Sequence, residues 1–248
     1  MNITNFRKKI IPVSFLSNGF HLKGFLHLPK TTQPPVIIGS HGLFSTGNSP
    51  KQLALAQKCI DLGIAYFRFD HSGCGESGGE FREITSLEGR VSDLLNAVHA
   101  VKEYPITGDN IGVFGSSMGG AAALSLAQKI EIKAIVTVAA PLRSAPILTA
   151  AESSGDLRGL PISFYKNQLR FDISENLSGI SRILIFHGDA DKVVPVSNAH
   201  ELYSKVSSPK KLIIQENGDH PMSDIRHQIK FMRSSADWFD RWLNHPDS

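Results

Sequence analysis

Cysteine is scarce in this chain of 248 residues, and long apolar runs are missing. The two cysteines, Cys59 and Cys74, lack the C-x-x-C spacing of redox and zinc motifs, which favours free thiols in a reducing compartment. No stretch approaches the length of a membrane span, and residues 1–10 carry charge without the apolar centre of a secretory signal. These absences together predict a cytoplasmic protein with no membrane span.

An excess of charge of one sign is also missing. The 26 Lys and Arg residues nearly balance the 23 Asp and Glu residues, and the formal net charge is only +3. Such a weak and scattered excess of basic residues predicts no nucleic-acid partner. The 10 histidines show neither H-x-x-x-H nor H-E-x-x-H spacing, so we expect no metal site.

Apolar runs alternate regularly with helical patterns along most of the chain. Runs typical of strands cover residues 13–15, 21–28, 34–42, 64–70, 110–116, 133–140, 181–188 and 210–217. Helical patterns cover residues 50–60, 87–101, 118–130, 197–206 and 224–243, and the spacing of Thr85 and Glu88 indicates a capping box before the second of them. Strands that are apolar throughout and alternate with helices predict an α/β fold, with a mostly parallel sheet covered on both faces. The length favours a single domain over residues 1–248.

The alternation is interrupted at residues 141–180. A gap of roughly forty residues is far longer than the usual connection of ~2–6 residues, and it is typical of a lid or binding element. We therefore expect a small lid insertion over about residues 141–180. Its aromatic side chains, Phe164, Tyr165 and Phe171, are candidates to line a substrate pocket, or they could instead pack the lid onto the body.

The stretch FGSSMGG contains a candidate nucleophile. Residues 115–119 fit the pattern G-x-S-x-G with Ser117 at its centre, and the pattern lies between a predicted strand and a predicted helix. That context is the one in which the motif forms a sharp turn that exposes a reactive hydroxyl. Bulk two residues before or after the serine would collide with the neighbouring backbone, which explains Gly115 and Gly119.

A serine hydroxyl needs a base to remove its proton, and in this architecture the acid and then the histidine follow the serine along the chain. The segment HGDADKVVP follows one predicted strand and offers Asp189 and Asp191 as acids. The segment NGDHPMS follows the next strand and offers His220 as the base. Because loops at the carboxyl ends of parallel strands meet at one edge of the sheet, we expect these side chains to converge with Ser117.

Two other patterns have less specific interpretations. GCGESG fits G-x-G-x-x-G, but the next helix begins well beyond it, so we interpret it as a structural loop and expect no dinucleotide or other cofactor. His41 precedes Gly42 in a turn, where we expect it to orient the loop and not to act as a base.

The segments IIGSHGLFS, FRFDHSGCGESGG, GSSMGG, HGDADKVVP and NGDH occur in the order found in the α/β-hydrolase superfamily, and the likeness covers nearly all of the chain. Within that superfamily the sequence resembles the small carboxylesterases of the serine-aminopeptidase-like, monoglyceride-lipase and cinnamoyl (feruloyl) esterase group. The resemblance implies that the acid is Asp191 rather than Asp189. It also implies that the backbone amides of Leu43 and Met118 form the oxyanion hole.

The function that this resemblance implies is hydrolysis of carboxylic esters with small or medium acyl groups, through a Ser-His-Asp triad and an acyl-enzyme. The expected partner is therefore a small-molecule ester substrate. An acyltransferase, or a peptidase or amidase, would use the same triad, and both stand as alternatives.

Overall fold

The computed structural model describes residues 9–155, 157 and 159–245, and its framework is an eight-stranded sheet in the order β1-β2-β4-β3-β5-β6-β7-β8. The strands are β1 (Lys9–Ser17), β2 (Phe20–Leu28), β3 (Val36–Ser40), β4 (Ala65–Phe69), β5 (Ile111–Ser116), β6 (Ala134–Val138), β7 (Ile183–Gly188) and β8 (Lys210–Gln215). β2 pairs antiparallel with both β1 and β4, and the pairs from β4 through β8 are parallel. The predicted α/β fold with a mostly parallel sheet is confirmed.

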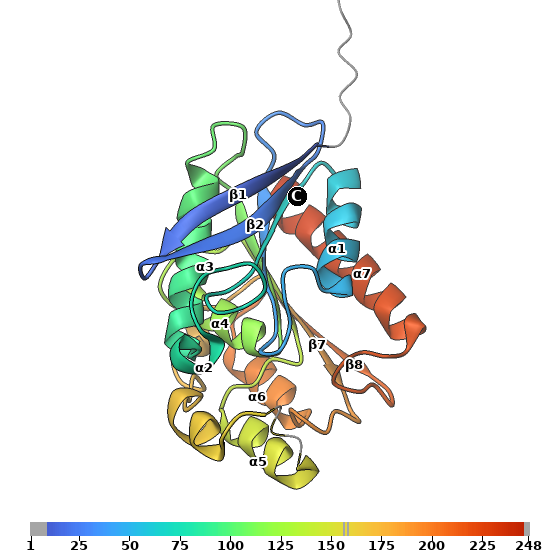
Figure 1. Ribbon diagram of the computed structural model, residues 1–248. Helices are drawn as coiled ribbons and strands as arrows, with labels where there is room; N and C mark the ends of the chain where they lie inside the picture. Colours follow the sequence, from blue (N-terminus) through green and yellow to red (C-terminus); the bar gives the residue numbers. More distant parts are fainter. Residues whose placement is uncertain (1–8, 156, 158, 246–248) are drawn as a thin grey trace, which may run out of the picture.

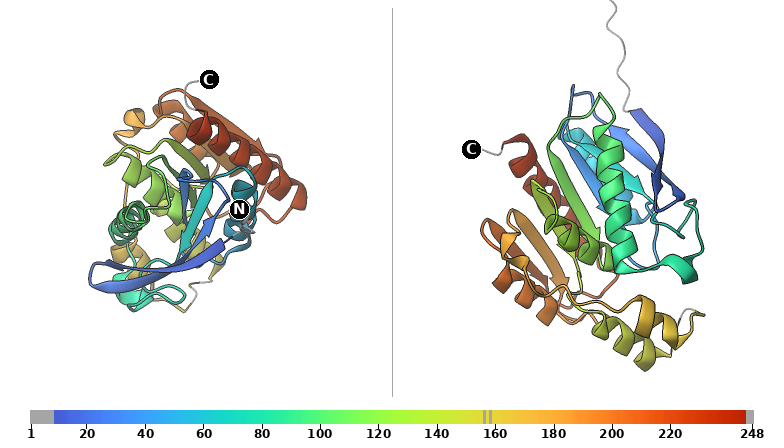
Figure 2. Two further views of the ribbon diagram at one scale, coloured as in Figure 1. Left: turned by 90° about the horizontal axis from the view of Figure 1, so that it is seen from above. Right: turned by 90° about the vertical axis from the view of Figure 1, so that its left-hand side faces the viewer.

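Helices cover both faces of this sheet, as Figures 1 and 2 show. The helices of the body are α1 (Pro50–Asp61), α2 (Phe81–Ile84), α3 (Leu87–Lys102), α4 (Met118–Ala127), α6 (Ser197–Lys205) and α7 (Ile225–Phe239), which a short π-helical turn, η3 (Asp240–Asn244), extends. Consecutive side chains of a strand point to opposite faces. Ile37 of β3 accordingly packs in the apolar core with α1 and α7, whereas Ile38 packs in the core with α3, α4 and α6.

The first turn of α3 differs from the expected capping box. Ser86, and not Thr85, is the N-cap, and its Oγ accepts a hydrogen bond of 3.0 Å from the Gly89 N–H. Thr85 instead ends the short helix α2, which the sequence pattern did not predict. α1 begins at Pro50 as expected, because proline lacks the N–H that the first turn of a helix leaves unpaired.

The described residues between 141 and 180 form a layer at one end of the molecule, seen below the sheet in Figure 1 and at the lower end of the right-hand view in Figure 2. The layer contains α5 (Ala145–Ser154), the π-helical turn η1 (Phe164–Gln168) and the 3₁₀ turn η2 (Leu177–Gly179). Arg143 fastens it to α6 through hydrogen bonds of 2.7 and 2.9 Å to the Glu201 carboxylate. Phe164 stacks on Phe81 of α2, with ring centroids 5.7 Å apart.

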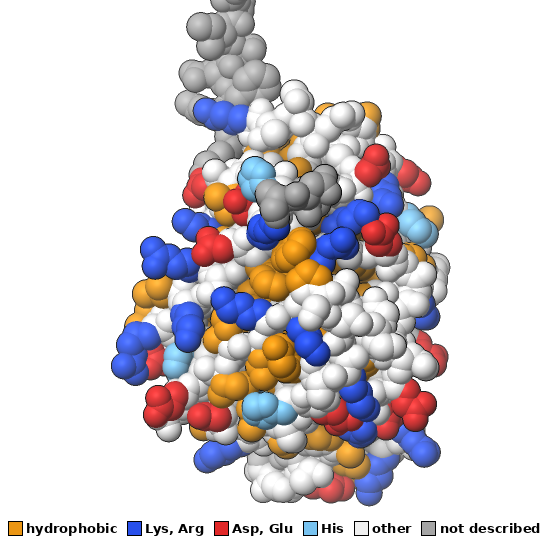
Figure 3. All heavy atoms as spheres, turned by 180° about the vertical axis from the view of Figure 1, so that it is seen from behind, with side chains coloured by type: hydrophobic (Ala, Val, Ile, Leu, Met, Phe, Trp, Pro, Cys, Tyr) orange, Lys and Arg blue, Asp and Glu red, His pale blue; other side chains and the backbone are white. Residues whose placement is uncertain are grey.

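Surface charge, membrane-spanning helices and the state of the cysteines were also predicted from the sequence. On the face shown in Figure 3, Lys and Arg side chains are interspersed with Asp and Glu around a central strip of apolar side chains. Across the described part of the chain, no helix combines the length and the apolar composition that crossing a membrane requires. Cys59 and Cys74 are free thiols, both buried.

Candidate active site

The turn between β5 and α4 holds Ser117 in a strained backbone conformation. Its φ is 53° and its ψ is −121°, a region that side chains other than glycine rarely occupy. The turn is held by a hydrogen bond of 2.8 Å from the Ser117 N–H to the Val138 carbonyl of the neighbouring strand. This geometry is that of a nucleophile elbow, which lifts the serine hydroxyl out of the backbone.

Two glycines make the turn possible because other chain segments pass very close to them. A Cβ at Gly115 would lie 2.4 Å from the carbonyl oxygen of Gly119. A Cβ at Gly119 would lie 2.1 Å from the carbonyl oxygen of Ser40. Both distances are too short for any side chain, so these positions require glycine for the reason expected from the motif.

His220 lies between Ser117 and Asp191, although the three residues come from loops after different strands. His220 Nδ1 is 2.7 Å from Asp191 Oδ2, and His220 Nε2 is 3.1 Å from Ser117 Oγ. A carboxylate can only accept, so Nδ1–H donates to Asp191 and leaves Nε2 free to accept the serine proton. The structure thus brings the predicted serine, histidine and acid into one hydrogen-bonded chain.

Asp191 is buried and tightly held. Its Oδ1 accepts hydrogen bonds of 2.8 Å from the N–H groups of Val193 and Val194. Burial alone would raise the pKa of Asp191, but the hydrogen bonds to His220 and to the two amides outweigh burial and keep the pKa below its usual value. Asp189, the competing acid, is exposed on the same turn and bonds through its backbone N–H to Gln215.

The turns that carry Asp191 and His220 lie directly against each other. The Ala190 N–H donates a hydrogen bond of 3.0 Å to the Gly218 carbonyl. A Cβ at Gly188 would lie only 2.1 Å from that same carbonyl oxygen. Backbone contact, and not side-chain packing, therefore sets the spacing between the carboxylate and the imidazole.

His187, at the end of β7, is a neighbour of this chain that the sequence pattern did not single out. Its Nε2–H donates to the Val194 carbonyl at 2.8 Å, and the same nitrogen is 3.5 Å from Asp191 Oδ2. Burial is the main cause that lowers the pKa of His187, so this ring is neutral and acts as a donor beside the carboxylate. The run HGD directly after an apolar strand is the signal that could have identified it.

The loop after β3 lies beside the nucleophile. A Cβ added to Gly42 would be 3.6 Å from the Ser117 Cβ, so the backbone of residues 41–43 passes alongside the serine. Met118 is the first residue of α4, where backbone N–H groups have no partner within the helix. Within the described residues, neither the Leu43 nor the Met118 amide donates a hydrogen bond to another protein group. Both amides can therefore act as donors to a ligand.

His41 supports this loop from below, as expected, and does not reach the triad. Its Nδ1–H donates to the Gly42 carbonyl at 2.8 Å, and its Nε2 accepts from the His71 N–H at 3.1 Å. Burial, followed by the nearby His71 and Arg90, holds the pKa of His41 well below its usual value. The His41 ring is thus a neutral structural group.

The glycine-rich segment after β4 is a structural loop, as interpreted from the sequence. The Asp70 carboxylate accepts hydrogen bonds from the Gly47 N–H at 2.7 Å and from the Glu76 N–H at 3.0 Å, and it thereby closes the loop.

Among the described residues, no group of three His, Cys, Asp or Glu side chains is arranged to hold a metal ion.

A cavity of about 540 Å³ opens at Ser117 and His220. Its lining includes both Ser117 and His220 together with Leu43, Phe44, Ile147, Ala150, Ala151, Tyr165, Lys192 and Val193. One wall is therefore α5, so the layer over residues 141–180 borders the site. The cavity has the size and the mostly apolar wall of a small-molecule pocket.

Of the three aromatic residues expected to line this pocket, the structure places only Tyr165 there. Its hydroxyl donates to the Leu157 carbonyl at 3.0 Å, which directs the ring across the cavity wall. Phe164 is buried against Phe81 and Tyr165 instead, and Phe171 lies where its backbone bonds with Ser144. Phe164 and Phe171 are not among the residues that line the cavity, and both pack against the apolar core, which is the other role considered for them.

Comparisons with known proteins agree with this geometry. The profile of the prolyl oligopeptidase family matches residues 51–246, well over half of the chain. Mouse mitochondrial palmitoyl-protein thioesterase ABHD10 is 29% identical over 237 residues, which span 86% of this chain and 77% of the relative. Among solved structures, the α/β hydrolase GrgF from a Penicillium species has a TM-score of 0.78 at 20% identity, covering 95% of this chain and 99% of its own. The Pyrococcus furiosus esterase Pf2001 has a TM-score of 0.81 at 17% identity, covering 98% of this chain and 94% of its own.

The resemblance to α/β hydrolases is confirmed by the family match, and the fold likeness extends over nearly the whole chain. This chain belongs to the prolyl oligopeptidase family and is an α/β hydrolase.

Proposed function

We propose that the protein is a serine hydrolase that cleaves carboxylic esters of small or medium acyl groups, with Ser117, His220 and Asp191 as its catalytic triad. The observation that carries the proposal is the hydrogen-bonded chain from Asp191 Oδ2 through His220 to Ser117 Oγ, with distances of 2.7 and 3.1 Å. The serine stands on a nucleophile elbow at the floor of the cavity, so its hydroxyl is reachable by substrate.

In the first half of the reaction, His220 Nε2 removes the Ser117 proton as Oγ attacks the acyl carbonyl carbon. Asp191 holds the imidazole in the required tautomer and stabilises the imidazolium that forms. The amides of Leu43 and Met118 donate hydrogen bonds to the oxygen that becomes negative. His220 then gives the proton to the leaving alkoxide, and an acyl-enzyme on Ser117 results.

In the second half, water takes the place of the alcohol. His220 removes a proton from the water as its oxygen attacks the acyl-enzyme, and the proton is then returned to Ser117 Oγ as the acid leaves. The apolar wall of the cavity, which α5 supplies through Ile147, Ala150 and Ala151, is the surface against which we place the acyl chain.

A thioester is a second candidate substrate, since the mouse relative that is 29% identical is named as a palmitoyl-protein thioesterase. Thioesters pass through the same tetrahedral oxyanion, so the same residues would act on them. Acyl transfer to an alcohol and hydrolysis of amides use the same triad. They differ from ester hydrolysis in the group that accepts the acyl chain and in the leaving group, respectively.

The proposal is tested by comparing kcat/KM across a panel of substrates under the same conditions. p-Nitrophenyl esters of increasing acyl length, from acetyl to dodecanoyl, and of an aryl acid are compared with an acyl thioester and with a p-nitroanilide, each with and without a competing alcohol. We expect turnover of the oxygen esters to exceed that of the anilide by orders of magnitude, because the anilide is the worse leaving group. Folded protein that cleaves none of the esters or thioesters would overturn the proposal, and faster anilide cleavage would replace it with a peptidase or amidase.

The wall that α5 contributes predicts how acyl length is selected. In the variant Ala150→Phe, the added ring fills the part of the cavity against α5. We expect kcat/KM for an octanoyl ester, relative to the acetyl ester, to fall ~10–100-fold, because excluding even one or two methylenes from an apolar pocket has an effect of this size. The same p-nitrophenyl ester series measures it.

Thr149→Phe is the matched control, since Thr149 is the exposed neighbour on the same helix and does not line the cavity. Equal length profiles for the two variants would show that α5 does not contact the acyl chain. They would thereby remove the proposed role of residues 141–180 as a lid.

A further inference from the structure

Arg90, on α3, is buried directly behind the loop that carries Leu43. Only 2% of the residue is exposed, and its guanidinium reaches from the helix to the loop backbone. Nη1 donates to the His41 carbonyl at 2.9 Å and to the Gly42 carbonyl at 3.4 Å. Nη2 donates to the Leu43 carbonyl at 3.1 Å. One side chain therefore binds three consecutive carbonyl groups.

These contacts, together with those of His41 Nδ1–H at 2.8 Å and the Ser45 N–H at 3.2 Å to the Gly42 carbonyl, show which way the neighbouring N–H points. The peptide between Gly42 and Leu43 is trans, so its C=O and N–H are directed oppositely. Because the Gly42 oxygen faces Arg90 on the α3 side, the Leu43 N–H faces away from α3. Gly42 itself lies beside Ser117, as the 3.6 Å separation of its ideal Cβ from the Ser117 Cβ shows. The N–H is thus turned to the side from which an oxyanion on the serine can accept.

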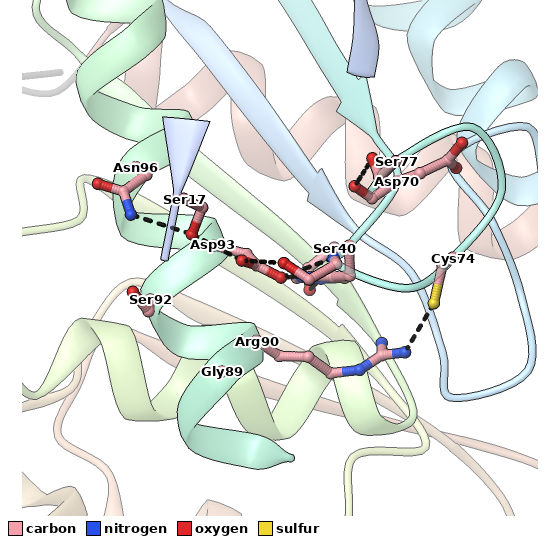
Figure 4. Close-up of polar contacts among 12 residues, drawn as sticks. Ser17, Ser40, Asp70, Cys74, Ser77, Gly89, Arg90, Ser92, Asp93 and Asn96 are labelled. Atoms are coloured by element: carbon pink, nitrogen blue, oxygen red, sulfur yellow. Dashed lines mark hydrogen bonds and ion pairs between the residues drawn. The ribbon is translucent and has the colours of Figure 1, made fainter. Parts of the chain in front are cut away.

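The charge of Arg90 has no carboxylate partner among the described residues. Its fourth contact is to Cys74 Sγ at 3.6 Å, drawn as a dashed line in Figure 4. The Asp93 carboxylate, one turn further along α3, accepts hydrogen bonds from Ser17, Ser72 and His71 and makes none with Arg90 among the described contacts. A buried cation without an ion pair is costly unless dipoles replace the lost water, and here three backbone carbonyls do so. The positive charge therefore stays directed at the oxyanion loop.

We propose that Arg90 is a positioning residue for the oxyanion hole: by binding the carbonyls of His41, Gly42 and Leu43, it fixes the peptide that directs the Leu43 N–H at the developing oxyanion. The inference rests on the proposed function, because it takes the Leu43 amide as an oxyanion donor. Loss of Arg90 removes the contacts to the His41 and Leu43 carbonyls on either side of this peptide and leaves only His41 and Ser45 to hold the Gly42 carbonyl, which loosens the alignment of the Leu43 N–H.

The test compares Arg90→Met and Arg90→Lys with the wild type. Fluorophosphonate titration first gives the fraction of sites that react, and kcat and KM are then expressed per titrated site. A trifluoromethyl ketone, whose adduct with Ser117 carries an oxyanion, gives an inhibition constant that reports the oxyanion hole alone. For Arg90→Met we expect kcat to fall ~10²-fold and the inhibition constant to rise by a similar factor, while KM stays within about twofold. Arg90→Lys should recover part of both effects, because an ammonium keeps the charge but cannot reach all three carbonyls.

Thr107→Ala is the control for lost stability. Thr107 is buried after the end of α3, where its hydroxyl donates to the Val101 and Tyr104 carbonyls at 2.9 Å, far along the helix from the oxyanion loop. We expect this variant to lower the melting temperature and to leave the per-site kcat and the inhibition constant unchanged.

The proposal is overturned if Arg90→Met folds, titrates, and binds the ketone within threefold of the wild type. If Arg90→Met does not fold, the same criterion is applied to Arg90→Gln, which keeps a polar side chain but lacks the charge and cannot reach all three carbonyls. Wild-type protein that neither reacts with fluorophosphonate nor turns over esters would instead overturn the proposed function, and the role of Arg90 with it.

Discussion

Replacing Ser117 with alanine is expected to lower kcat for p-nitrophenyl esters by a factor on the order of 10⁶, since no other group of the triad can form the acyl-enzyme. The effect is that large because the serine and the histidine act as a unit. Without Oγ, the imidazole of His220 has only water to activate. Labelling by fluorophosphonate should vanish in the same variant.

The substitution leaves the elbow intact. Ser117 holds its turn through its backbone N–H, which donates to the Val138 carbonyl at 2.8 Å, and alanine keeps that group. The melting temperature should therefore stay within a few degrees of the wild type. Ser125→Ala, on the same helix α4 but not among the residues that line the cavity, serves as the matched control with full activity. Undiminished ester turnover or continued labelling in Ser117→Ala would place the nucleophile elsewhere.

Asp191→Asn is expected to lower kcat by ~10⁴, because the same substitution of the acid in the chymotrypsin-type triad has an effect of this size. The structure gives the reason. Asp191 Oδ1 accepts from the Val193 and Val194 amides, so an asparagine oxygen would take that place and its NH₂ would face His220 Nδ1. Two donors would then oppose each other, and the imidazole would be driven to the tautomer that cannot accept the serine proton.

Asp189→Asn is the comparison that makes this test specific. Asp189 lies on the same turn, but it is exposed and only its backbone N–H has a partner within the described fold, the Gln215 carbonyl. Its substitution should change kcat less than about tenfold, because no contact of the triad involves its side chain. A large loss in Asp189→Asn with a small one in Asp191→Asn would mean that the acid has been assigned to the wrong residue.

The sequence could predict the parts of this site that local patterns encode. G-x-S-x-G between a strand and a helix is a local requirement for close backbone approach, and the clashes that a Cβ would make at Gly115 and Gly119 agree with it. The convergence of Ser117, the acid and His220 follows from strand ends that share one edge of the sheet. Spacing alone did not separate Asp189 from Asp191, since both lie on one turn, and that choice came from resemblance.

The parts that could not be predicted depend on contacts between residues far apart in the chain. Arg90 is one of two charged residues, with Asp93, on the buried face of α3, and its role is visible only because α3 passes behind residues 41–43. Phe164 and Tyr165 are adjacent in sequence, yet one is buried against Phe81 and the other lines the cavity. Which of the two rings lines the cavity depends on how this segment packs against the rest of the fold, and the hydrophobic pattern of the segment does not indicate that.

The contact between Gly188 and Gly218 also constrains how this protein can be recombined with its relatives. Since the turns of residues 188–191 and 217–220 meet backbone to backbone, they behave as one part made from two pieces of chain. A crossover placed between them would join an acid turn from one parent to a histidine turn from another, with no flexible side chains at the seam to absorb the mismatch. Chimeras that keep both turns from the same parent preserve the fit, whatever happens to the helix between them.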